Sequence, residues 1–92
     1  MRKKKEISNL QNNSQMQSLA DLKEGKKGKI IGILPGNESI ERLVELGLVI
    51  GEEVLMIKKA PLGDPLEIKV MNYNLCIRKS EASFIEIGLI DQ

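Results

Sequence analysis

Residues 61–79, PLGDPLEIKVMNYNLCIRK, join a stiff turn to two segments in which apolar and polar residues alternate. The alternation runs through residues 66–71 and again through residues 73–78, with Asn72 as the corner between them. A period of two is typical of a strand with one buried and one solvated face. This part of the chain therefore predicts a β-hairpin and favours a β fold for the residues around it.

The turn at residues 61–65 places an apolar side chain at its tip. Pro61 and Pro65 restrict the backbone, Gly63 supplies a positive φ angle, and Asp64 is held extended because a proline follows it. We expect Leu62 to be exposed, because from this position it cannot easily reach the core of its own domain. An exposed apolar residue on a rigid turn can mark a docking surface, since little entropy is lost when such a turn binds. A single exposed leucine is also common on protein surfaces, so both interpretations stay open.

Signals on either side of the hairpin complete a mainly β domain. Apolar runs bounded by Gly, Pro or Asn predict strands, and apolar residues at i, i+3 and i+4 from Ile40 predict one short helix that Gly47 ends. Besides the hairpin, we expect a helical turn at residues 19–22, strands at 29–34, 53–60 and 84–87, the helix after an N-cap at Asn37 or Ser39, and a helical turn at 79–83. About five strands around one inserted helix indicate a small antiparallel barrel with an aliphatic core.

The 92-residue chain lacks the residue types that most catalytic and metal sites need. It has no His and no Trp, and one each of Cys, Tyr and Phe. Without His there is no imidazole base or ligand, and one Cys cannot form a zinc cluster or an internal disulfide. We expect Cys76 to be a small space-filling residue. The carboxylates are spread out and indicate solvated surface charge, so the sequence predicts no enzyme, no cofactor and no metal site.

Charge divides the chain into a basic N-terminal tail and a slightly acidic remainder. Residues 1–18 carry four basic and one acidic residue, whereas residues 19–92 carry ten basic and twelve acidic residues. The Asn-, Gln- and Ser-rich segment 8–18 has too little apolar surface to offset the entropy cost of ordering it. We therefore expect a flexible basic and polar tail at residues 1–17 and one domain at residues 18–92. The apolar runs are too short to span a membrane, so we expect a cytoplasmic protein without membrane insertion.

A lysine-rich loop offers an alternative function. In the segment Gly25-Lys26-Lys27-Gly28-Lys29, glycines flank the lysines, a composition that can approach a phosphate and that resembles the basic loop of KOW-type ribosomal barrels. Together with the basic tail, Lys26–Lys29 would form an RNA-binding surface whose affinity falls steeply with added salt. The structural interpretation is a strand-entry turn with solvated lysines. The acidic balance of residues 19–92 and the lack of aromatic residues argue against binding of nucleic acid.

Several blocks of residues follow one another in a set order along the second half of the chain. They are RLVELGL at residues 42–48, Gly51, APLGDPLEI at residues 60–68, YNLCIRK at residues 73–79 and Glu81-Ala82. This series resembles the FeoA family of small ferrous-iron-transport accessory proteins, and the resemblance covers residues 19–90. It implies an SH3-like barrel with an inserted helix that acts in the bacterial cytoplasm.

The resemblance also implies a partner. FeoA proteins are associated with FeoB, a membrane transporter that carries a cytoplasmic GTP-binding domain and itself moves iron(II). We therefore expect a docking protein that modulates the transport or GTPase activity of a FeoB-type transporter. The candidate contacts are Leu62 as the anchor, Gly63 for close backbone approach, Asp64 and Glu67 as a polar or charged rim, and Arg42 and Glu45 as a second contact on the outer face of the helix. A further hypothesis is that Arg42 or Arg78 acts as an arginine finger on the transporter GTPase.

Overall fold

The structure is a computed structural model, and it describes residues 16–90. Within this range the chain forms six strands and three short helices. The strands are β2 (Met16–Ser18), β3 (Lys27–Ile33), β4 (Glu53–Lys59), β5 (Leu66–Val70), β6 (Tyr73–Ile77) and β7 (Ile85–Leu89). The helices are the 3-10 helix η1 (Leu19–Asp21), α2 (Ile40–Glu45) and α3 (Lys79–Ala82). All six strands join one antiparallel sheet in the order β2-β7-β3-β4-β5-β6, so the predicted mainly β fold is confirmed.

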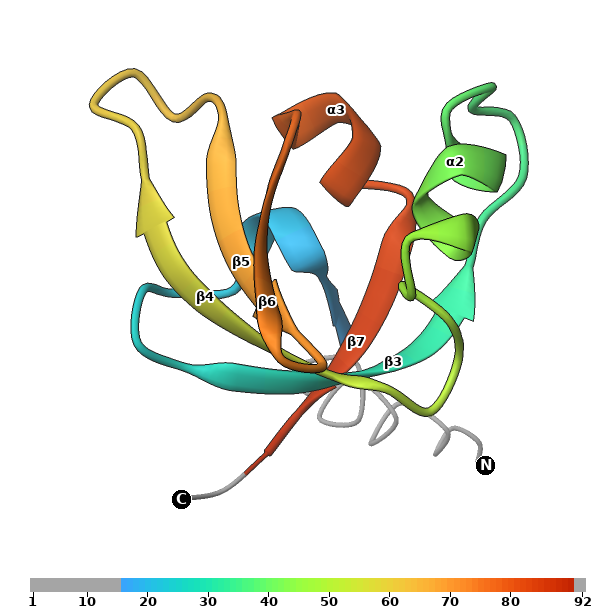
Figure 1. Cartoon of the computed structure of the whole chain (residues 1–92), viewed down its shortest axis with the longest axis horizontal. Helices are drawn as coiled ribbons and strands as arrows, with labels where there is room; N and C mark the ends of the chain where they lie inside the picture. The colour runs from blue at the N-terminus through green and yellow to red at the C-terminus, as the bar shows by residue number, and fades with distance from the viewer. Residues whose placement is uncertain (1–15, 91–92) are drawn as a thin grey trace, which may run out of the picture.

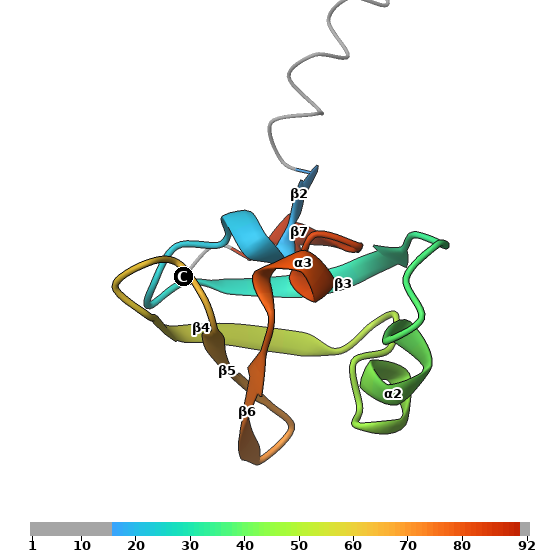
Figure 2. The ribbon, with the colours of Figure 1, turned by 90° about the horizontal axis from the view of Figure 1, so that it is seen from above.

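The sheet curls strongly instead of lying flat. In Figure 1, β3 and β4 run across the base, β5 and β6 rise from it, and α3 sits between the upper ends of β6 and β7. Helix α3 also contacts η1, which follows the edge strand β2. Figure 2 shows that α2 stands to one side of the strands. No helix within residues 16–90 is long and apolar enough to cross a membrane.

The first strand, β2, is absent from the elements that the sequence predicts. It pairs with β7 from Met16↔Gly88 to Ser18↔Glu86, and its first two residues fall in the range assigned to the tail. Its sequence, Met-Gln-Ser, has no apolar alternation, so the strand conformation depends on the edge that β7 offers. The remainder of the predicted tail, residues 1–15, lies outside the described residues.

The core is aliphatic, as the sequence predicts. Its fifteen buried hydrophobic residues include no aromatic one, and Tyr73 remains 39% exposed. The alternation in β5 is borne out because Leu66, Ile68 and Val70 are buried. The prediction for Cys76 is wrong: its side chain is exposed, because it lies on the uncovered face of the edge strand β6.

Helix α2 has six residues, and its end is defined by backbone hydrogen bonds. The Leu48 N–H donates to the Leu43 carbonyl and the Gly47 N–H donates to the Val44 carbonyl, each at 3.0 Å. Gly47 has a φ of +109°, so these bonds form the Schellman arrangement that the sequence suggests. Leu43 and Leu48 are both fully buried. The helix is therefore attached to the core at its C-terminal end.

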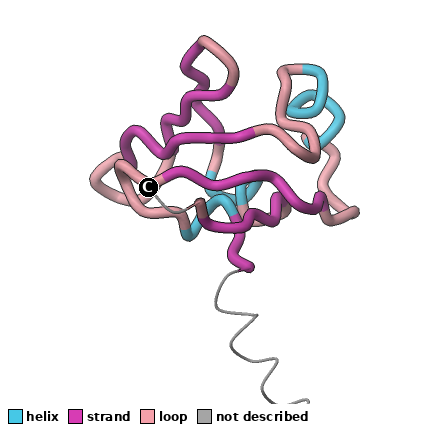
Figure 3. Tube along the Cα trace, turned by 90° about the horizontal axis from the view of Figure 1, so that it is seen from below, coloured by secondary structure: helices cyan, strands magenta, loops and turns pink. Residues whose placement is uncertain are grey.

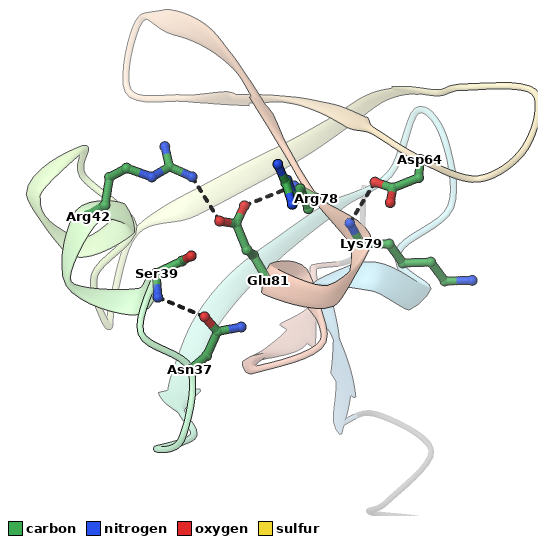
Figure 4. A network of polar contacts seen from close by, with 7 residues as sticks. All are labelled: Asn37, Ser39, Arg42, Asp64, Arg78, Lys79 and Glu81. Carbon is green, nitrogen blue, oxygen red and sulfur yellow. Dashed lines mark hydrogen bonds and ion pairs between the residues drawn. The ribbon is translucent and has the colours of Figure 1, made fainter.

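Glu81 connects α2 to α3 through a buried carboxylate (Figure 4). The residue is only 4% exposed and is the one buried charged residue within the described part of the chain. Its Oε2 accepts a hydrogen bond from Arg42 Nη2 at 2.9 Å, and its Oε1 accepts one from the backbone N–H of Arg78 at 2.9 Å. The second bond satisfies a donor at the start of α3 that has no partner within the helix. One carboxylate thus fixes both helices relative to each other.

The pKa of Glu81 reflects a competition between burial and hydrogen bonding. Burial disfavours the charged carboxylate and by itself would raise the pKa of Glu81. Hydrogen bonds from the Arg78 N–H, the Arg42 guanidinium and the Ser39 side chain favour the charged form more strongly, so the pKa of Glu81 lies below its ordinary value. A carboxyl group whose pKa is lower in the folded state than in the unfolded chain stabilises the fold at neutral pH. That contribution disappears as the pH falls through the folded-state value. Acid therefore weakens the connection between α2 and α3.

We expect Glu81→Gln to lower the free energy of unfolding at neutral pH by about 1–2 kcal/mol and to flatten its loss in acid. The Arg42 side chain is 52% exposed, so solvent screens its share and most of the loss comes from the bond to Arg78. Urea unfolding between about pH 3 and pH 7 measures both effects. Glu41→Gln, at an exposed position of α2, is the matched control and should change stability by less than about 0.5 kcal/mol. Equal stability and an unchanged pH profile for Glu81→Gln would contradict this role.

Candidate functional site

The turn between β4 and β5 carries Leu62 at its tip. Leu62 is 96% exposed, the most exposed large hydrophobic residue in the described chain, so the predicted exposure is confirmed. Gly63 has a φ of +89°, and its N–H donates to the Ala60 carbonyl at 2.7 Å. The Ala60 N–H in turn donates to the Pro65 carbonyl at 3.1 Å, and the Asp64–Pro65 bond is cis. The turn is thus hydrogen-bonded internally while its apolar tip faces solvent.

Two carboxylates attach this turn to the rest of the domain. Asp64 Oδ1 accepts a hydrogen bond from the Lys79 N–H at 2.9 Å, which joins the turn to the start of α3 (Figure 4). On the other side, Glu24 Oε2 accepts a bond from the Lys59 N–H at 2.7 Å, at the end of β4. The backbone that presents Leu62 is therefore held at both ends. Such anchoring lowers the entropy that a partner would have to remove on binding.

The other predicted contact residues lie in different surroundings. Glu67 is on β5, where its Oε2 accepts a hydrogen bond from Asn74 Nδ2 of β6 at 3.2 Å. Arg42 pairs with Glu81, whereas Glu45 is exposed near the end of α2. Figure 1 places α2 and the β4–β5 turn on opposite sides of the domain. The structure thus brings together Leu62, Gly63 and Asp64 and separates them from Arg42 and Glu45.

Packing within the sheet explains why the second glycine of the lysine-rich segment, Gly28, is a glycine. Gly28 lies within β3 and pairs with Val54 on one side and Leu89 on the other. A Cβ at this position would lie 2.7 Å from Ile87 Cδ1. Because Gly28 is part of the sheet, its backbone belongs to the ladder between β4 and β7 and does not form a phosphate cradle. The geometry therefore favours the structural interpretation of this segment.

The structure also identifies attachment residues that sequence analysis does not single out. Glu81 has a recognisable signal, since it stands three residues after Arg78, the N-cap of α3, at the position where a glutamate can return a bond to the N-cap backbone. Glu24 has no such signal, because its partner Lys59 is 35 residues away. Within residues 16–90, no group of three Cys, Asp or Glu side chains lies close enough to hold a metal ion. The turn presents the apolar side chain of Leu62 to solvent.

Known proteins match most of the chain. A family model described as "FeoA domain" matches residues 17–88. The chain is 32% identical over 72 residues to the "Fe(2+) transport protein A/Fe(2+) transporter FeoB fusion protein" of Porphyromonas gingivalis (strain ATCC BAA-308 / W83). This match covers 78% of the present chain but 8% of that relative, so the chain spans only a small part of the relative's length.

Solved structures agree with this match. The FeoA-like protein from Clostridium acetobutylicum is 32% identical and superposes with a TM-score of 0.78, covering 85% of this chain and 91% of that one. The zinc complex of Stenotrophomonas maltophilia FeoA, described as a prokaryotic SH3 domain protein, is 33% identical with a TM-score of 0.69, covering 78% and 89%. The predicted SH3-like fold is therefore confirmed, and the protein belongs to the FeoA family.

Proposed function

We propose that this protein is a non-enzymatic accessory protein of bacterial ferrous iron uptake. It docks through Leu62 on the cytoplasmic side of a FeoB-type transporter and modulates the transport or GTPase activity of that transporter, which itself moves the iron(II). The observation that carries the proposal is the nearly complete exposure of Leu62 on a turn held at both ends. An exposed apolar side chain on an anchored backbone adds nothing to the packing of its own domain and can bind a partner with little loss of conformational entropy.

The Porphyromonas gingivalis relative supports the choice of partner. Its name describes one polypeptide that joins an Fe(2+) transport protein A part to FeoB. A covalent link keeps two parts together at high effective concentration, whereas separate polypeptides need a surface that supplies affinity. In the described part of this chain, the anchored turn is the feature best suited to that task.

The expected contribution of Leu62 can be estimated from its area. Complete burial of a leucine side chain contributes about 1.5–3 kcal/mol, which is enough for an interface hot spot. Gly63 has nothing within 4 Å of the position of a Cβ, so a partner can approach the backbone beside the leucine closely. The matching surface on the transporter is therefore a small apolar pocket.

We expect Leu62→Asp to weaken binding to the cytoplasmic GTP-binding domain of the transporter by about 30-fold or more, because the apolar anchor is replaced by a charge. Isothermal titration calorimetry measures the affinity, and thermal unfolding checks that the fold is unchanged. Leu89→Asp, at a 47% exposed position on β7, is the matched control and should bind like the unmodified protein. Equal affinity for the unmodified protein and Leu62→Asp would contradict the anchor role.

Modulation is tested by measuring GTP hydrolysis by the transporter domain with and without this protein. We expect saturating unmodified protein to change the rate, and Leu62→Asp to leave it at the value of the domain alone. Arg78→Ala tests the arginine-finger hypothesis, since Arg42 is already paired with Glu81. Full binding of Arg78→Ala with loss of stimulation would support Arg78 as the finger. An unchanged rate at saturating unmodified protein would refute GTPase modulation.

A further inference from the structure

A second apolar surface lies at the C-terminal end of α2. Four of the eight exposed large hydrophobic residues within residues 16–90 lie on α2, on the loop that follows it or on the β5–β6 hairpin, and we call them the α2–hairpin patch: Val44 (37% exposed), Ile50 (64%), Met71 (56%) and Tyr73 (39%). Gly47 is their meeting point, since a Cβ there would lie 3.2 Å from both Met71 Sδ and Tyr73 Oη. Val44 lies three residues before Gly47 and Ile50 three residues after it. Figures 2 and 3 show α2 and the β5–β6 hairpin projecting on the same side of the sheet.

The backbone conformation of Met71 is unfavourable for a methionine and lowers the stability of the fold. It occupies the first position of the two-residue turn between β5 and β6 with a φ of +58°, where Gly, Asn or Asp is usual. Its side chain gains little from packing because more than half of it is exposed. Residues kept in such conformations against local preference cluster at binding sites. A methionine also adapts its shape to different apolar partners.

The surroundings of the patch are acidic on the helix side. Glu41 and Glu45 are exposed on α2, and Glu52 and Glu53 follow at the start of β4. The one cation between residues 41 and 53, Arg42, is held by Glu81 at 2.9 Å. Next to Met71, a hollow of about 560 Å³ is lined by Glu52 and Glu53 at the beginning of β4 and by Lys27 and Lys69 from β3 and β5. The border of the patch therefore carries carboxylates toward α2 and two lysines toward the strands.

The charges around the patch indicate which kind of partner can bind to it. An anionic membrane surface would be repelled by the glutamates. Cytoplasmic segments beside the membrane helices of a transporter are rich in Lys and Arg, and electrostatic complementarity favours their contact with the acidic side of the patch toward α2. We propose that the α2–hairpin patch is a second docking site that takes a Lys- and Arg-rich segment with apolar side chains from the same transporter. This inference rests on the proposed function and adds the location and chemistry of a second contact.

The two docking sites have different physical signatures. Leu62 is an apolar anchor, whereas the patch combines apolar contact with charge. Added salt should therefore weaken the contribution of the patch to the binding affinity and leave the contribution of Leu62 nearly unchanged.

The test is binding to the full-length FeoB-type transporter in nanodiscs of neutral phosphatidylcholine. Met71→Gly removes the exposed side chain and suits the positive φ, so it should retain or raise stability while weakening binding by about tenfold. Glu45→Lys should weaken binding by about tenfold at low salt and reduce the salt dependence. Leu89→Gly and Asp21→Lys are matched controls at exposed positions on β7 and η1, and both should bind like the unmodified protein.

The outcomes separate this inference from the proposed function. If Met71→Gly and Glu45→Lys bind like the unmodified protein while Leu62→Asp does not, the second site is wrong and the first docking site stands. If the unmodified protein does not bind the transporter at all, both proposals fail. Binding of the unmodified protein to protein-free vesicles of anionic lipid, lost in Met71→Gly, would assign the patch to a membrane and would overturn the inference.

Discussion

The burial of Leu66, Ile68 and Val70 in β5 is the interaction on which the remaining structure depends. Because side chains alternate along a strand, a shift of one residue would turn all three to solvent, so their burial fixes the register of β5 against β4 and β6. A fixed register also fixes where the preceding turn leaves the barrel. Leu62 is exposed because it lies in this turn, beyond the end of β4 and before the start of β5.

Three carboxylates in this domain hold its loops and helices in position. Glu24 and Asp64 hold the two ends of the β4–β5 turn, and Glu81 holds α2 and α3. The carboxylates expected at a docking rim are thus partly occupied within the chain. Two exposed apolar features are left on the surface: Leu62 on one side of the domain and the α2–hairpin patch on the other.

Local patterns explain how much of this could be predicted. The alternation over residues 66–71, the glycine after α2 and the prolines around Leu62 each act over a few residues, and the predictions from them agree with the structure. The alternation over residues 73–78 is borne out only in part, since Tyr73 is exposed. β2 could not be predicted, because its strand conformation comes from pairing with β7. The burial of Glu81 and the exposure of Cys76 depend on which elements cover them. The α2–hairpin patch could not be predicted from the sequence either, because Gly47 and Met71 come close together only in the folded chain.

Mapping the contact surface by NMR tests the role of the β4–β5 turn most directly. The ¹⁵N-labelled protein would be titrated with the unlabelled cytoplasmic GTP-binding domain of the transporter, and changes in amide chemical shift would be followed for each residue. We expect the largest changes at the amides of Ala60, Leu62, Gly63 and Asp64, with the amides of β2 and β7 nearly unaffected. Saturable binding with changes confined to residues 26–29 or to β2 and β7, and none at the turn, would contradict docking through Leu62.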